Sequence, residues 1–156
     1  MSADLVFNIS QALSAYARCL DEDRLEDWPD FFAQDCLYRV TSAQNIRDGY
    51  EASLIFLNSK GMVQDRVSAL RQANIYERQA YRHLIGQPFL VSNDGMRVVS
   101  EAPFMVARIM RDGTTDHFAT GCYRDTWRIK AGNIELIERI VICDSSRIDT
   151  LLALPL

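Results

Sequence analysis

The feature that most limits the possible folds of this sequence is a change in hydrophobic period near residue 79. Before it, apolar residues recur every three or four positions. After it, four long segments rich in β-branched and aromatic residues follow one another. Helices followed by a long meander of strands predict a cone-shaped α+β domain, with the helices packed on the concave face of a curved antiparallel sheet. The segments span 80–92, 96–113, 114–130 and 133–146, and the turns between them contain Asn93-Asp94-Gly95, Asp112-Gly113 and Ala131-Gly132-Asn133.

The first half of the chain predicts two amphipathic helices and one strand. Apolar spacing over 4–20 predicts the first helix, and similar spacing over roughly 60–73 predicts the second. Residues 36–42 are predicted to form a strand, whereas 52–59 fit either a strand or a helix.

Local signals predict a third, short helix and two irregular points in the strands. Asp23 is the expected N-cap of the short helix, whose apolar face extends to Phe32 and whose first turn tolerates Pro29. Pro103 and Gly121 lie inside predicted strands, where we expect bulges or kinks. Strands of ten or more residues must bend to enclose a core, and these positions allow it.

Composition excludes several classes of function. The chain has 156 residues and no linker-like stretch, so we expect one domain over 1–156. Its net charge of −4 argues against a nucleic-acid or anionic-membrane surface. The start of the chain has no basic region followed by an apolar stretch, and no apolar run could span a bilayer. We therefore expect a cytoplasmic protein.

Cysteine and histidine spacing argues against a metal or cofactor site in this chain. Only two histidines occur, so an iron site of two histidines and one carboxylate would need both His83 and His117. Nucleotide-binding, α/β-hydrolase and zincin motifs are absent from the sequence. The four cysteines form no CxxC or CxH pattern and are predicted to be small buried hydrophobes: Cys19, Cys36, Cys122 and Cys143.

The long strands carry more charge than a simple sheet needs. In 133–144, alternation places Glu135, Ile137 and Arg139 on one face; in 116–129, Arg124 and Asp125 fall on opposite faces. Buried charge is costly unless paired, so these residues indicate either a polar pocket inside the cone or an outer face that docks onto another protein. Solvated charge at strand edges is the third explanation.

Three segments give the sequence a specific resemblance. CLDEDRLEDWPDFFAQDCLYRVTS (19–42) resembles the start of the small (β) subunits of aromatic-ring-hydroxylating dioxygenases, and RQANIYERQAYRHLIG (71–86) resembles the opening of their main sheet. FATGCYRDTWRI (118–129), followed by ERIVICDSS and LLALPL, resembles their closing hairpin and tail. The sequence of these segments is most similar to the branch of terephthalate and salicylate-type hydroxylases.

This resemblance implies an NTF2-like, scytalone dehydratase-like cone and a catalytic centre that belongs to another chain. In the family, the large (α) subunit carries a Rieske [2Fe–2S] cluster and a mononuclear Fe(II), with NAD(P)H electrons supplied through a reductase. The small subunit is chiefly structural, assembles with α subunits and with its own copies, commonly as α3β3, and needs no cofactor itself. The reaction implied is the hydroxylation of an aromatic, carboxylated ring.

The same interpretation predicts where the subunit contacts lie. We expect them on the outer face of the curved sheet and on the C-terminal tail. The candidate contact residues are Trp28, Tyr81, Arg82, Arg124, Trp127, Arg139 and Leu156.

The chain is also similar to scytalone dehydratase at some active-site positions, which gives an alternative function. Asp21 matches an aspartate that orients a histidine, His83 matches that histidine, and Tyr38 matches one of two water-positioning tyrosines, while Leu20 replaces the other. An Asp–His pair of this kind can act as a general acid or base. The alternative to catalysis is a buried polar pair that only contributes packing specificity.

A third possibility is a free-standing module that binds a small apolar ligand. Phe104, Met105 and Ile109 are the candidate lining residues, with ordinary core packing as the alternative.

Overall fold

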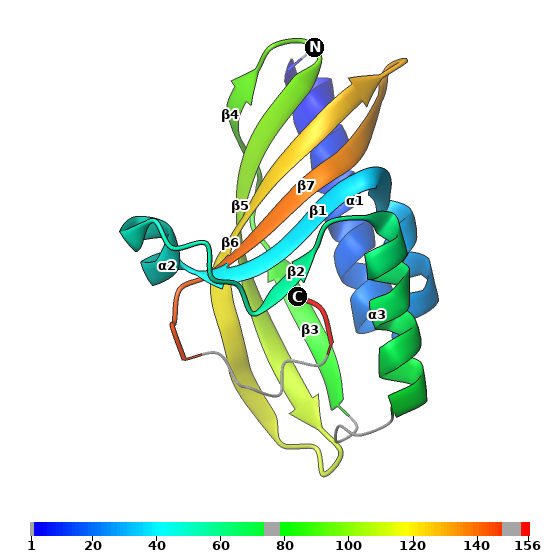
Figure 1. The fold of residues 1–156 in the computed structure, drawn as a ribbon, viewed down its shortest axis with the longest axis vertical. Coiled ribbons are helices and arrows are strands. Elements are labelled where there is room, and N and C mark those ends of the chain that lie inside the picture. The colour runs from blue at the N-terminus through cyan, green and yellow to red at the C-terminus, as the bar shows by residue number, and fades with distance from the viewer. Residues whose placement is uncertain (1, 74–78, 148–153) are drawn as a thin grey trace.

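The computed structural model describes residues 2–73, 79–147 and 154–156. The long helices α1 and α3 lie against a curved sheet whose strand order is β2-β1-β7-β6-β5-β3, with β4 also paired to β5, and α2 lies apart from them (Figure 1). The predicted architecture, helices first and then a curved sheet, is confirmed. The elements are α1 (Ser2–Asp21), the 3-10 helix η1 (Leu25–Phe31), β1 (Phe32–Ser42), α2 (Ala43–Asp48), β2 (Ile55–Leu57), α3 (Lys60–Ala73), β3 (Gln79–Ile85), β4 (Phe89–Asn93), β5 (Arg97–Met110), β6 (Thr115–Lys130) and β7 (Asn133–Cys143).

The two long helices form where the hydrophobic period predicts them. α1 buries Ile9, Leu13 and Tyr16, which lie on one helical face. α3 begins after Ser59, whose Oγ accepts a hydrogen bond from the Met62 amide at 3.2 Å. Between them, 52–59 contains the short strand β2, and α2 is a helix that the sequence analysis did not predict.

Asp23 ends α1 and does not cap the next helix, so the N-cap prediction is wrong. Its φ of 58° is left-handed. The Asp23 amide bonds to the Leu20 carbonyl, and the Arg24 amide bonds to the Cys19 carbonyl. These two bonds are the Schellman pattern of a helix C-terminus, in which the left-handed residue is usually glycine. η1 then begins at Leu25, with Pro29 inside it, and β1 starts at Phe32.

The sheet is antiparallel except at one pair. β1 runs parallel to β7, so the first strand of the chain lies beside the last one. The predicted segment 80–92 divides into β3 and β4, and each pairs with part of β5. Strand pairing therefore wraps a continuous surface around the helices.

The strand irregularities lie elsewhere than predicted. β5 and β6 shift register at Val106/Ala107, and β6 and β7 shift at Thr126/Trp127, whereas the pairing continues without a shift through Pro103 and Gly121. Gly121 is needed for another reason: a Cβ there would lie 2.0 Å from the Ile142 carbonyl oxygen. β6 and β7 approach too closely at this point for any side chain.

The shift between β6 and β7 also changes which β7 side chains face the interior. Trp127 pairs with Leu136 and Thr126 with Glu138, so Ile137 is the extra residue. Leu136 and Arg139 are both buried as a result, although strict alternation places them on opposite faces. The face assignment from simple alternation is therefore wrong for this part of β7.

Candidate functional site

Asp21 and His83 form the buried pair that the alternative function requires. Asp21 is the last residue of α1, and His83 lies in β3, which packs against that helix. His83 Nδ1 is 2.6 Å from Asp21 Oδ1, and the His83 backbone amide donates to Asp21 Oδ2 at 3.0 Å. Because a carboxylate only accepts, the Nδ1 atom carries the proton in this contact. The side chains are 0% and 4% exposed.

The remaining nitrogen of His83 makes no hydrogen bond within the part of the chain that the structure describes. Nε2 is buried and has no hydrogen-bond partner among the described residues. Fixed by Asp21 in one tautomer, the imidazole is arranged as a general base would be. Such a base also needs a substrate within hydrogen-bonding reach, which its surroundings would have to admit.

Tyr38, the third residue of that alternative, is occupied by the chain itself. Its hydroxyl donates to the Leu156 carbonyl oxygen at 3.1 Å and accepts from the Leu156 amide at 3.2 Å. The Tyr16 hydroxyl donates to the same carbonyl oxygen at 2.8 Å. Burial raises the pKa of both tyrosines, so these hydroxyls remain protonated. The structure therefore pairs Asp21 with His83 as expected, whereas the Tyr38 hydroxyl is hydrogen-bonded to Leu156.

The residues proposed to line an apolar ligand site do not converge. Phe104 is buried and stacks on Tyr123 with ring centroids 4.4 Å apart. Met105, the next residue along β5, is 43% exposed on the opposite face. Ile109 lines a separate open hollow of about 220 Å³ near Met110. The structure therefore does not join Phe104, Met105 and Ile109 in one pocket.

Most of the candidate contact residues lie inside the chain. Their side chains belong to its own core and cannot serve as contacts from the folded surface. C-terminal residues 151–153 lie outside the described residues, and Leu156 is 0% exposed. The buried candidates are Trp28, Tyr81, Trp127, Arg139 and Leu156.

Arg139 is held by a buried ion pair between aromatic rings. Its Nε and Nη2 atoms bind Asp125 at 2.8 and 2.7 Å, and both side chains are essentially unexposed. The guanidinium carbon lies 4.1 Å from the ring centroids of both Tyr16 and Tyr123. Asp125 raises the pKa of Arg139 against the opposing effect of burial, so the pair stays charged. Arg139 also lines an interior hollow of about 190 Å³ with Trp127.

The outer face of the sheet carries the exposed candidates. Arg82 is 70% exposed and lies 3.8 Å from Asp21, while Arg124 is 44% exposed and bonds to Glu101 at 2.9 Å. β5 turns alternate residues outward, and large apolar side chains gather beside them. We call this the outer stripe; it comprises Leu84, Phe89, Pro103 and Met105, where Leu84 pairs with Met105 and Phe89 with Glu101.

The prediction that the cysteines are buried is confirmed for Cys19, Cys36 and Cys143 but not for Cys122. Burial raises the pKa of Cys19 to about 11 and that of Cys143 to about 12. Cys36 is also buried, whereas Cys122 is half-buried. A thiol with a raised pKa is a poor nucleophile and a poor metal ligand at neutral pH.

No metal centre is present among the residues that the structure describes. In these ranges, no three His, Cys, Asp or Glu side chains lie close enough together to hold an ion. His83 is committed to Asp21, and His117 is exposed near the far end of β6. Within the same ranges, no helix has the length and apolarity to cross a membrane.

Comparison with known proteins decides the family. The profile described as "Ring hydroxylating beta subunit" matches residues 15–150. The chain belongs to this family. It is 48% identical over 143 residues to the terephthalate 1,2-dioxygenase terminal oxygenase component subunit beta 1 of Comamonas sp., covering 92% of this chain and 93% of the relative. The family resemblance inferred from the three segments is thereby confirmed, and the chain is a ring-hydroxylating dioxygenase beta subunit.

Other relatives agree with this assignment. The anthranilate 1,2-dioxygenase small subunit of Burkholderia cepacia is 33% identical, with coverage of 96% of this chain and 93% of the relative. The crystal structure of the beta subunit of an assigned aromatic-ring-hydroxylating dioxygenase from Novosphingobium aromaticivorans matches with a TM-score of 0.91, 39% identity and 99% coverage of both chains. An assigned scytalone dehydratase from the same organism, 13% identical with a TM-score of 0.68, covers 92% of this chain and 87% of its own and shares the fold alone.

Sequence reasoning missed two features of the beta subunit. The Leu156 backbone is a ligand of two tyrosines, and no side-chain pattern signals a backbone contact. The outer stripe was also missed, although Leu84 alternates with the buried Tyr81 and His83 in β3 in a way that places it outside.

Proposed function

We propose that this beta subunit is a structural component of a terminal oxygenase, with no catalytic centre of its own. The single observation that carries this proposal is the internal pairing of the candidate catalytic groups, in which Tyr38 binds Leu156 and His83 binds Asp21. Polar groups that could act on a substrate are instead used to hold the chain together. The whole chain, 1–156, acts as one domain that presents an outer surface.

The metals belong to an α subunit. The described residues of this chain do not fit either metal group. No three of their His, Cys, Asp or Glu side chains lie close enough together to hold an ion, and burial raises the pKa of the Cys143 thiol to about 12. Under this proposal a Rieske [2Fe–2S] cluster and a mononuclear Fe(II) reside in the α partner, as the family resemblance implies, and NAD(P)H electrons reach them through a reductase. An α3β3 assembly in the cytoplasm, with contacts between beta copies, follows the family.

The substrate is an aromatic ring that bears a carboxylate. Two relatives support this class, since their names record terephthalate and anthranilate, which are both carboxylated rings. The residues that recognise the ring lie in the α subunit under this proposal.

The outer stripe, extended by Arg124 and Arg82, is the proposed surface for the α subunit. Phe89 is 71% exposed and Leu84 is 63% exposed, which is unusual for large apolar side chains on one face of a sheet. An apolar patch beside the Arg124–Glu101 pair has the composition of a protein interface.

Co-purification of variants with the α subunit tests this assignment. Phe89→Ser together with Leu84→Ser should lower recovery of the tagged α subunit at least tenfold, since each deletes an apolar contact. Phe7→Ser is the matched control, because Phe7 is 62% exposed but lies on α1. Equal recovery from the stripe variant and the control would contradict the proposed surface.

The Asp21–His83 geometry favours one second candidate, an acid–base reaction such as dehydration in the interior. The Nε2 atom of His83, which is buried without a hydrogen-bond partner among the described residues, is the observation in its favour. The bond of the Tyr38 hydroxyl to Leu156 argues against this reaction. Substitution of His83 separates the two candidate functions.

A further inference from the structure

The interior of the cone receives one backbone residue, Leu156, in a cradle of side chains. Tyr16 comes from α1 and Tyr38 from β1, and their hydroxyls bind the same carbonyl oxygen at 2.8 and 3.1 Å. Tyr38 also accepts from the Leu156 amide at 3.2 Å. These residues lie 140 and 118 positions from Leu156 in the sequence, so the contact is tertiary rather than part of a strand ladder.

Apolar packing accompanies the hydrogen bonds. Leu154 is 6% exposed and Leu156 is 0% exposed, and both belong to the main core cluster. The Leu156 side chain is therefore buried in the apolar core, and its backbone carbonyl and amide are hydrogen-bonded. This is how a protein recognises a short apolar peptide: backbone groups are hydrogen-bonded and side chains are buried.

The cradle has little use without its occupant. Both recorded hydrogen bonds of the Tyr38 hydroxyl go to Leu156, and Tyr38 is fully buried. If the segment left, this hydroxyl would be buried without a partner, which is costly. The neighbouring Tyr123 hydroxyl is already buried with no partner among the described residues, so the region has further hydrogen-bonding capacity.

We propose that the interior of this beta subunit is a peptide-binding site filled in cis by Leu154–Leu156. Its ligand class is a short apolar peptide with leucine at the position of Leu156, recognised through Tyr16 and Tyr38. Displacing the segment opens the site to the same peptide supplied in trans. The inference stands independently of the proposed α-subunit surface.

The test uses the full-length chain with Leu156→Asp. A charged side chain cannot occupy a position that is 0% exposed, so the segment leaves and the Tm falls. Adding N-acetyl-Leu-Pro-Leu should raise the Tm again, in proportion to the logarithm of its concentration. Adding Tyr38→Phe should weaken binding of this peptide roughly tenfold, the effect of losing about one net hydrogen bond.

Two controls make the result specific. Leu54→Asp changes a leucine that is 52% exposed, and it should neither lower the Tm nor create a response to the peptide. The peptide N-acetyl-Leu-Pro-Asp should not rescue Leu156→Asp. A folded Leu156→Asp variant that ignores N-acetyl-Leu-Pro-Leu would overturn the proposal.

A second measurement applies if Leu156→Asp does not fold. In the otherwise unchanged full-length chain, Tyr38→Phe should speed hydrogen exchange of the Leu156 amide at least tenfold, because it removes the acceptor of that amide. Unchanged exchange would show that Tyr38 does not hold the segment.

Discussion

At the scale of single residues, several buried polar groups of this chain are paired with each other. Asp125 binds Arg139, Asp21 binds His83, and Tyr38 binds Leu156, while His83 Nε2 and Arg139 Nη1 have no hydrogen-bond partner among the described residues. Such pairs add little net stability over apolar packing, but breaking one of them is costly. Variants that separate the partners therefore measure what each pair contributes.

Asp125→Ala should be among the most destabilising single changes. It leaves the Arg139 guanidinium charged and buried, with an expected loss of about 3–5 kcal/mol in the free energy of unfolding. Arg139→Met should cost a similar amount, while the double variant should cost less than the sum. Urea denaturation of all four proteins gives the coupling energy. Additive losses would contradict a shared, mutually compensated pair.

His83→Gln distinguishes a structural pair from a catalytic one. The amide cannot reproduce both the ring contact to Asp21 and the aromatic packing, so we expect a loss of about 1–3 kcal/mol in stability. In the assembled oxygenase, turnover per iron should stay within about twofold of the parent. His117→Gln is the matched control, because His117 is exposed. Loss of turnover by the folded, assembled His83→Gln variant alone would favour catalysis.

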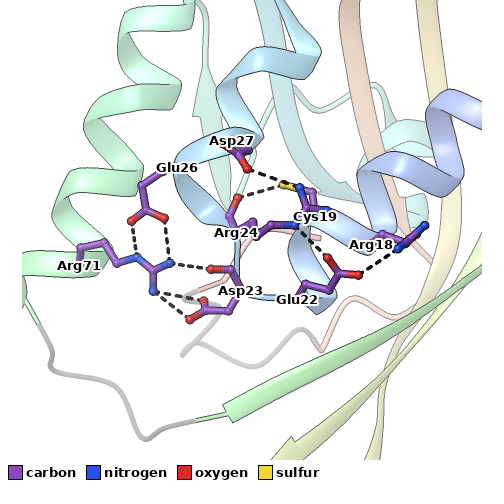
Figure 2. A network of polar contacts seen from close by, with 8 residues as sticks. All are labelled: Arg18, Cys19, Glu22, Asp23, Arg24, Glu26, Asp27 and Arg71. Atoms are coloured by element: carbon purple, nitrogen blue, oxygen red, sulfur yellow. Dashed lines mark hydrogen bonds and ion pairs between the residues drawn. The ribbon is translucent and has the colours of Figure 1, made fainter.

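At the scale of elements, one polar network ties the helices together near the turn that follows α1 (Figure 2). Arg71 of α3 binds Glu26 at 2.7 and 3.0 Å, and it binds both carboxylate oxygens and the carbonyl oxygen of Asp23. The left-handed turn at Asp23 is thereby fixed at the end of the helix that carries Asp21. The network is on the surface, but it positions a buried residue.

Arg71→Met should lower the Tm modestly, by less than about 1 kcal/mol in stability, because these groups are largely exposed and screened. Arg71 lowers the pKa of Glu26, so the stabilisation is full above the unfolded value of 4.5 and is lost as the pH falls through the lower folded value. The Tm difference between parent and variant should shrink below pH 4.5 and at high salt. A difference that is independent of both would argue for packing instead of charge.

Gly121→Ala tests the close approach of β6 to β7. Its Cβ would lie 2.0 Å from the Ile142 carbonyl oxygen, so the strands must separate, at a cost of about 1–3 kcal/mol or more. Gly61→Ala in α3 is the matched control, since its nearest neighbour is 3.8 Å away and alanine favours a helix. Thermal unfolding of both variants should show a loss for the first and no loss for the second.

Hydrophobic period predicted the long elements well because it is set by which face is buried. The helix over 60–73 and the change to strands near residue 79 both follow from this rule. Asp23 was misassigned because an aspartate before a helix is usually an N-cap, whereas here it is the left-handed end of the previous one. The burial of both Arg139 and Leu136 could not be predicted. A single extra residue in β7, Ile137, reverses the face on which the preceding β7 side chains lie.

The site was less predictable than the fold. The contact between Asp21 and His83 could be predicted because both residues resemble the Asp–His pair of an enzyme. Most of the contact candidates are buried, because Arg, Tyr and Trp are typical both of interfaces and of this chain's polar, aromatic core. Sequence alone does not separate these environments.

At the scale of the whole molecule, the chain is a curved sheet packed against its long helices (Figure 1). Its core contains the paired Tyr38 and His83, and its outer face carries the apolar outer stripe. These two properties suit a subunit that positions another chain.

The central claim is that this beta subunit supplies structure while its partner supplies the metals. Iron analysis of the purified chain, alone and after co-expression with its α subunit, tests it most directly. The account predicts no bound iron in the chain alone and iron that co-elutes with the complex of both subunits. One tightly bound iron per isolated beta chain would contradict it.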